Sequence, residues 1–123
     1  MQIISPDKVI RGKDAWKKSL PEIVNISKFP MLLGRSSKTR SLRSIISKDL
    51  SQLNLKVYNC ELEFDCCEDD LKRIYNLSVE QKCDSIIAAG GGKVLDAGKL
   101  LAEYLSVPCI TVPLSASTCA GWT

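Results

Sequence analysis

The sequence predicts an α/β fold in which an open, mainly parallel sheet carries helices on both faces. Short apolar runs alternate along the 123 residues with longer segments whose apolar residues recur every three or four positions. The connections between these segments are only a few residues long, as in chains of parallel βαβ units. One run, residues 29–34, is apolar throughout, which is typical of a strand covered on both faces.

The N-terminal third is expected to begin with a strand, a helix and a second strand. Residues 8–12 indicate a short strand and a turn. Residues 14–25 indicate a helix that Asp14 could cap, and Pro21 leaves open whether this is one helix or two short ones. The apolar run 29–34 is the next strand.

The middle of the chain is expected to hold two helices on either side of a strand. The clearest helix spans residues 37–53, because its apolar residues repeat at helical spacing: Leu42, Ile45, Ile46, Leu50 and Leu53. Residues 55–60 indicate a strand. Residues 68–81 indicate a helix with the inner stripe Leu71, Ile74, Tyr75 and Val79.

The last third predicts a central strand at 85–89, a helix at 93–105 and a strand at 109–112. The carboxyl ends of parallel strands share one edge of the sheet, and ligands of such sheets bind at that edge. The turns at 34–35, 90–92 and 113–118 all fall there. We therefore expect the functional site at this edge.

The turn at 90–92 is the strongest functional signal, because three glycines separate a buried strand from an amphipathic helix. Without Cβ atoms in the turn, an anion can approach the main chain closely. The helix adds N–H groups without intrahelical partners and the positive end of its dipole. A plain glycine turn is the alternative, but this position favours a phosphate or nucleotide site.

One segment of the chain reads Gly90-Gly91-Gly92-Lys93-Val94-Leu95-Asp96-Ala97-Gly98-Lys99, and it is followed by Val107-Pro108 and Val112-Pro113-Leu114-Ser115-Ala116-Ser117-Thr118. This pattern resembles the glycerol-dehydrogenase branch of the iron-containing alcohol dehydrogenase family. The resemblance implies a Rossmann-like nucleotide-binding domain over residues 1–123, similar to the N-terminal domain of dehydroquinate synthase. It implies NAD or NADP as the cofactor and a small alcohol or polyol as the partner in hydride transfer.

The resemblance also implies zinc or iron, held by an Asp and histidines in a helical second domain. This sequence has no histidine. We therefore expect the metal-binding domain to lie outside this chain, and the chain alone to bind no catalytic metal and to be inactive. The complete protein is expected to be a homo-oligomer.

Two other interpretations of the function stay open. One is a different enzyme on the same fold, such as a glycerol-1-phosphate dehydrogenase or a dehydroquinate-synthase-like enzyme. The other is a nucleotide-binding module without catalysis, which the lack of histidine favours. Lys93 and the Ser-Thr pair before Cys119 fit a glycerol dehydrogenase better than either.

The resemblance assigns cofactor contacts to the glycine loop and its helix, and to hydroxyls beyond the last strand: Gly90, Gly91, Gly92, Lys93, Asp96, Ser115, Ser117 and Thr118. Lys93 would lie near phosphate. The alternatives are that Lys93 faces water, that Asp96, expected in the first turn of its helix, only complements the dipole, and that the hydroxyls bond their own backbone.

Cys119 departs from the family pattern, which has an Asp here that reaches the polyol substrate. A thiol supplies a fixed negative charge only when its pKa is depressed. We assign Cys119 to the substrate site, with a small semi-buried filler as the alternative. No catalytic residue is assigned.

Arg35 stands where the family usually carries an Asp that bonds the adenosine ribose and repels a 2′-phosphate. A guanidinium followed by the hydroxyl of Ser36 suits a 2′-phosphate, which favours NADP. The alternative is a solvated basic entrance to the next helix, with Ser36 or Ser37 as its N-cap.

Composition narrows the class of protein further. A net charge of +3 is too small to indicate nucleic-acid binding, and no apolar run is long enough for a membrane helix. No signal peptide is visible at the N-terminus, and the six cysteines contain no C-x-x-C pair. We therefore expect free thiols and a cytoplasmic protein without a zinc site of its own.

Overall fold

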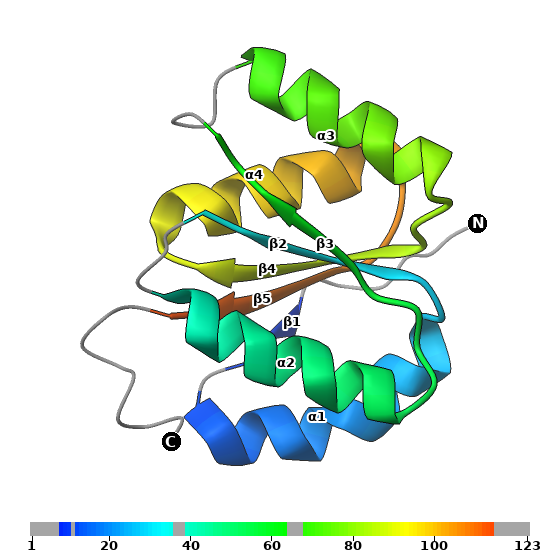
Figure 1. Cartoon of the computed structure of the whole chain (residues 1–123), viewed down its shortest axis with the longest axis vertical. Coiled ribbons are helices and arrows are strands. Elements are labelled where there is room, and N and C mark those ends of the chain that lie inside the picture. The colour runs from blue at the N-terminus through cyan, green and yellow to red at the C-terminus, as the bar shows by residue number, and fades with distance from the viewer. Residues whose placement is uncertain (1–7, 11, 36–38, 64–67, 115–123) are drawn as a thin grey trace.

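The computed structural model describes residues 8–10, 12–35, 39–63 and 68–114, and it confirms the predicted α/β fold (Figure 1). Strands and helices alternate in the order β1 (Lys8–Val9), α1 (Gly12–Ile26), β2 (Pro30–Gly34), α2 (Arg40–Gln52), β3 (Tyr58–Glu61), α3 (Glu68–Glu80), β4 (Ser85–Gly90), α4 (Gly92–Leu105) and β5 (Cys109–Pro113).

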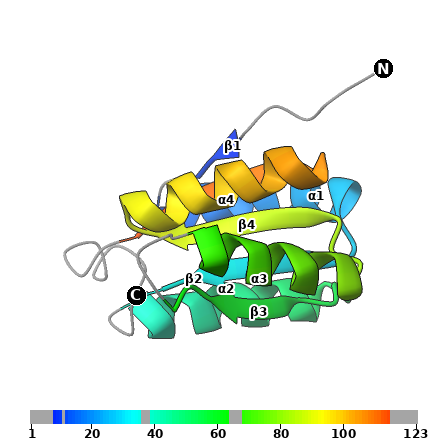
Figure 2. The same ribbon diagram turned by 90° about the horizontal axis from the view of Figure 1, so that it is seen from above.

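The five strands form one parallel sheet in the order β1-β5-β4-β2-β3, with β4 in the predicted central place. Helices α1 and α2 cover one face, and α3 and α4 cover the other (Figures 1 and 2). Alternate residues of each strand supply the two cores: Leu32 and Ile87 pack under α1 and α2, whereas Met31, Leu33 and Ile86 pack under α3 and α4. Every residue of β2 and β4 is buried, as their apolar sequences require.

Helix α1 runs without a break through Pro21, so the two-helix alternative is wrong. Trp16 before the proline and Ile23 after it are buried in the same core. Packing therefore holds both halves on one axis despite the missing N–H of the proline.

The buried stripes of α2 and α3 are narrower and more polar than predicted. Ile45 and Leu53 are exposed on α2, and Tyr75 and Val79 are exposed on α3. Charged or polar side chains are buried beside the apolar ones instead: Arg43 on α2, and Asp70 and Ser78 on α3. Strand β3 begins at Tyr58, later than the predicted residue 55.

The strand order reverses direction between β2 and β4. From β2 the chain moves outward to β3, and from β4 it moves to β5 on the other side. Helices α2 and α4, which follow β2 and β4, leave on opposite faces of the sheet (Figure 2). A crevice at the carboxyl ends of two such strands is the usual ligand site of open α/β sheets.

The outer edge of β3 is bonded by α3. The Leu62 N–H bonds the Gly34 C=O at 2.8 Å, so the main-chain groups of the residues on either side of Leu62 face away from β2. Arg73 Nη2 donates to the outward Glu61 C=O at 2.9 Å, and Asp70 Oδ2 accepts the outward Glu63 N–H at 2.9 Å. Arg73 also pairs with the fully buried Asp70 carboxylate at 2.7 Å.

The amino ends of β2 and β4 are joined by a separate network around Asp84. Its carboxylate accepts from the Ser27 hydroxyl and from the N–H groups of Lys28 and Phe29. The Ser27 and Ser85 hydroxyls are 2.7 Å apart. In the described part of the chain no helix is both long and apolar enough to cross a bilayer.

Candidate functional site

A small cavity of about 190 Å³ lies at the reversal point of the sheet, between the β2–α2 and β4–α4 turns. Its walls come from both turns: Arg35, Thr39, Gly90, Gly91, Gly92, Lys93 and Val94. We call it the switch-point cavity. The sequence placed five of these residues in the cofactor site, namely Arg35, Gly90, Gly91, Gly92 and Lys93, and the fold brings them together.

The glycine turn leaves open space in front of its main chain. Apart from the adjoining main chain, a Cβ added at Gly91 or Gly92 would meet no atom of the described residues within 4 Å. Gly90 has a φ of 158°, and a Cβ there would crowd the Val94 side chain at 3.1 Å. The turn is therefore a shallow cradle that side chains would close.

The cradle is lined by main-chain donors at the start of α4. A helical bond runs from the Leu95 N–H to the Gly91 C=O at 3.1 Å. The N–H groups at the start of an α-helix lie ahead of this ladder of bonds and point outward along the helix axis. Gly91 is the N-cap and has no side chain to cap them. Together with the helix dipole, these groups suit an anion.

The two side chains predicted beside the glycines are placed differently. Lys93 is exposed and lines the cavity. Asp96 is exposed, is not among the cavity residues, and lies beyond the first turn of α4, which begins at Gly92. The helix begins one residue earlier than predicted, so the expectation of Asp96 in its first turn is wrong by one residue.

The β2–α2 turn supplies the opposite wall. Arg35 is exposed and lines the cavity beside Thr39, which is 4% exposed and is the N-cap of α2. Thr39 was missed because the sequence allowed the helix to begin at Ser37. Ser36 lies outside the described residues.

Arg43 supports this wall from behind. It is 5% exposed, and its side chain crosses directly over Gly34: a Cβ on Gly34 would lie 2.1 Å from Arg43 Nε. Arg43 Nη1 donates to Thr39 Oγ1 at 2.6 Å, and Nη2 pairs with Glu61 at the end of β3. Sequence reasoning missed this cluster, because Glu61 lies 18 residues from Arg43.

Glu61 joins two arginines of α2. Arg40 donates to both of its carboxylate oxygens, at 3.1 and 3.0 Å, and Arg43 pairs with one of them. The hydrogen bond from Arg40 and the charge of Arg43 hold the pKa of Glu61 below its ordinary value, against the opposing effect of burial.

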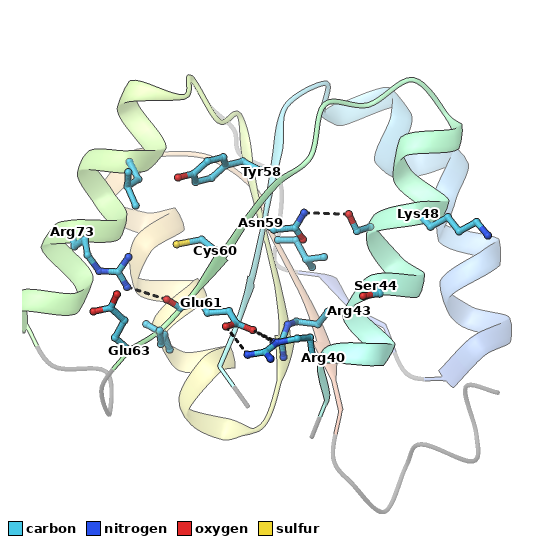
Figure 3. A pocket seen from close by; sticks show the side chains of 14 residues that line it. Arg40, Arg43, Ser44, Lys48, Tyr58, Asn59, Cys60, Glu61, Glu63 and Arg73 are labelled. Atoms are coloured by element: carbon cyan, nitrogen blue, oxygen red, sulfur yellow. Dashed lines mark hydrogen bonds and ion pairs between the residues drawn. The ribbon is translucent and has the colours of Figure 1, made fainter. Parts of the chain in front are cut away.

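The same cluster lies at one end of a larger groove of about 950 Å³ (Figure 3). The groove follows the outer side of β3 between α2 and α3, and Figure 3 shows Arg40 and Glu61 together at one end, with Tyr58 toward the other. None of its lining residues belongs to the glycine turn. Arg43 lines the groove and bonds Thr39 of the switch-point cavity, so it is the link between the two.

The end of β5 adjoins the glycine turn, because the Leu114 N–H donates to the Gly90 C=O at 2.9 Å. The predicted hydroxyl contacts come next in the chain. They lie outside the described residues, as does the predicted substrate residue: Ser115, Ser117, Thr118 and Cys119.

The described cysteines do not form a metal site. Among residues 8–10, 12–35, 39–63 and 68–114, no three Cys, Asp or Glu side chains are grouped as a metal ion requires. Cys60, Cys83 and Cys109 are free thiols. Burial raises the pKa of Cys60, and it raises the pKa of Cys83 to about 11, so neither resembles an activated thiol.

The chain matches the iron-containing alcohol dehydrogenase family over residues 6–123. It is 27% identical over 116 residues to a glycerol dehydrogenase of Escherichia coli, covering 94% of this chain and 32% of that protein. It is 38% identical over 48 residues to a glycerol-1-phosphate dehydrogenase [NAD(P)+] of Methanothrix thermoacetophila, covering 39% of this chain and 14% of the relative.

Among solved structures, a glycerol dehydrogenase from Schizosaccharomyces pombe superposes with a TM-score of 0.72 at 22% identity. That match covers 90% of this chain and 28% of the yeast protein. The chain thus spans a third or less of the relatives described here, and the structural likeness extends over nearly all of its own length.

Proposed function

The chain belongs to the iron-containing alcohol dehydrogenase family, and we propose that it is the nucleotide-binding domain of a metal-dependent alcohol or polyol dehydrogenase. The proposal rests above all on the open glycine cradle at the reversal point of the sheet. The N–H groups at the start of α4, the dipole of this helix and the absent Cβ atoms of Gly91 and Gly92 fit a dinucleotide diphosphate. The names of the relatives support a small alcohol or polyol as the substrate.

In this proposal the chain's own residues bind and orient the cofactor. The main chain of Gly91, Gly92 and Lys93 holds the diphosphate, and the hydroxyl-bearing residues Ser115, Ser117 and Thr118 contact the cofactor. The bound nicotinamide supplies the hydride chemistry. In the complete enzyme, a zinc or iron ion would activate the substrate oxygen.

We further propose that the cofactor is NADP. The support is Arg35, which lines the switch-point cavity at the end of β2. Helix α2 has no acidic residue in its first turn and begins with Arg40, so no carboxylate of that turn repels a 2′-phosphate. A guanidinium pairs with phosphate through two hydrogen bonds, which a ribose hydroxyl cannot match.

Calorimetric titration of the chain with NADPH and NADH tests both proposals. Binding of either nucleotide is expected, with NADPH tighter, and the preference should fall in Arg35→Asp. Absence of binding by both nucleotides would overturn the dinucleotide site. Tighter binding of NADH by the wild type, or a ratio that Arg35→Asp leaves unchanged, would overturn the NADP assignment alone.

A further inference from the structure

Arg43 is a buried cation in a place where stability alone does not call for one. It is 5% exposed and lies in the first turns of α2, where the positive end of the helix dipole disfavours a cation. Replacing a buried ion pair by apolar residues of similar volume is often neutral or stabilising. The burial of Arg43 therefore needs a reason other than packing.

The contacts of Arg43 tie together three chain segments at the carboxyl edge of the sheet. Its side chain lies against Gly34 at the end of β2, where only a glycine leaves room for it. It donates to Thr39 at the N-cap of α2 and pairs with Glu61 at the end of β3. Two of these points, Gly34 and Thr39, stand on either side of Arg35 in the sequence.

Arg43 itself is not among the residues that line the switch-point cavity, whereas Arg35 and Thr39 are. Arg43 can therefore act on a ligand in that cavity through Thr39 and Gly34, which it contacts. Because Arg43 cannot accept a hydrogen bond, Thr39 Oγ1 is the acceptor in their contact, and the hydroxyl hydrogen of Thr39 is directed away from the guanidinium.

We propose that Arg43 is a positioning residue for cofactor selectivity, which fixes the Gly34–Arg35 turn and Thr39 against the 2′-substituent of the adenosine ribose. The inference rests on the proposed dinucleotide site. Arg43 holds the wall of the cavity in place, and Arg35 makes the contact. Small displacements of positioned groups are costly, since a shift of about 1 Å can cost about a hundredfold in rate.

The test compares the ratio of NADH to NADPH dissociation constants in the wild type, Arg43→Met and Arg43→Lys. Met keeps much of the volume without the charge. Lys keeps the charge but has no planar fork to reach Thr39 and Glu61 together. Both variants are expected to weaken NADPH binding by about tenfold and to lower the ratio, while NADH binding changes by about threefold or less.

The control is Ser27→Ala, which disturbs the buried hydroxyl network at the opposite end of the sheet. The ratio of NADH to NADPH dissociation constants in this variant is expected to match that of the wild type, even if its urea midpoint falls as far as that of Arg43→Met. This separates selectivity from a general loss of stability. Should Arg43→Met fail to fold, the same measurements on Arg43→Lys decide the matter.

Each outcome counts for or against the inference. A ratio unchanged in both arginine variants overturns it and leaves the dinucleotide site standing. If Arg43→Lys keeps the wild-type ratio while Arg43→Met lowers it, the charge of Arg43 sets the selectivity, and the proposed positioning role is wrong. A wild type that binds neither nucleotide overturns the proposed function, and the inference with it.

Discussion

The two turns that meet at the reversal point both contain glycine, but for opposite reasons. At the end of β2, the space beside Gly34 is filled by the Arg43 side chain, which a Cβ would strike at 2.1 Å. At the start of α4, no side chain of the described part of the chain comes within 4 Å of the Cβ positions of Gly91 and Gly92. One glycine makes room for a side chain of the protein itself, and the others border open space, where we propose that the cofactor binds.

The difference shows that a glycine at a strand end does not by itself indicate a binding site. What distinguishes the two turns is the neighbouring chain. Helix α2 folds its own Arg43 back over the strand, whereas no described side chain of α4 lies within 4 Å of the Cβ positions of Gly91 and Gly92. Substitutions at the two turns should therefore separate stability from binding.

Gly34→Ala should have the largest effect, on stability. The methyl group displaces Arg43 from its buried contacts with Thr39 and Glu61, and we expect the free energy of unfolding to fall by about 2 kcal/mol. Urea unfolding measures this loss. Gly91→Ala is the matched control and should stay within about 0.5 kcal/mol of the wild type, since its Cβ meets open space.

The double variant Gly34→Ala/Arg43→Ala sharpens this prediction. With the guanidinium removed, the added methyl group has nothing to displace, so the two losses should be clearly less than additive. Strict additivity would show that Arg43 is not what makes Gly34 necessary.

Gly92→Val should have the next largest effect, on binding. Its branched side chain enters the open cradle, and we expect NADPH and NADH to bind more than tenfold more weakly, a loss of about 1.4 kcal/mol. The urea midpoint should barely move, because no described residue occupies that space. Unchanged calorimetric binding would contradict the proposed diphosphate site.

Lys93→Ala should have a smaller effect. Its ammonium group lies at an exposed rim, and screened contacts of this kind are worth less than about 1 kcal/mol. We expect NADPH affinity to fall by about threefold at low ionic strength, with the difference shrinking as salt is added. A loss as large as that of Gly92→Val would instead show that the side chain, and not the main chain, holds the phosphate.

Acidification should have the smallest effect on the free energy of unfolding, and at the turn after β2 it should act through Glu61. The pKa of Glu61 is held below its ordinary value of 4.5, so its carboxylate stabilises the folded chain above that pH. This stabilisation is lost as the pH falls below 4.5 toward the lower pKa of the folded state. The effect should be modest, since the Glu61 side chain is 40% exposed.

Glu61→Gln provides the comparison for acidification. This variant should show a shallower fall in unfolding free energy below pH 4.5 than the wild type, while Gly92→Val should follow the wild-type curve. Parallel curves for the wild type and Glu61→Gln would show that Glu61 does not contribute to acid sensitivity.

Much of the fold could be predicted because it follows from patterns within single segments of the sequence. The apolar runs of β2 and β4 and the helical spacing of Leu42, Ile46 and Leu50 correspond to what is buried. Periodicity failed for Ile45 and Val79, which sit at the margins of their stripes and meet solvent. The width of a buried stripe depends on the neighbouring elements, which a single helix does not encode.

The site was predictable on one side only. The glycine cradle is a contiguous motif, so the sequence revealed it. The Arg43 cluster joins residues of α2 and β3 that share no motif, and only the pairing of β2 with β3 brings them together. Ser36, Ser115, Ser117, Thr118 and Cys119 lie outside the described residues and stay predictions.

The contacts of α3 with β3 affect whether strands of other copies of this domain can pair with the edge of its sheet. A foreign strand that extended the sheet past β3 would need the Glu61 C=O and the Glu63 N–H, and both are already bonded by Arg73 and Asp70. At the other margin, β1 offers an edge of two residues within the described chain. Two polar side chains of one helix thus act as a guard against amyloid-like stacking, a task usually met by charges or bulges on the strand itself.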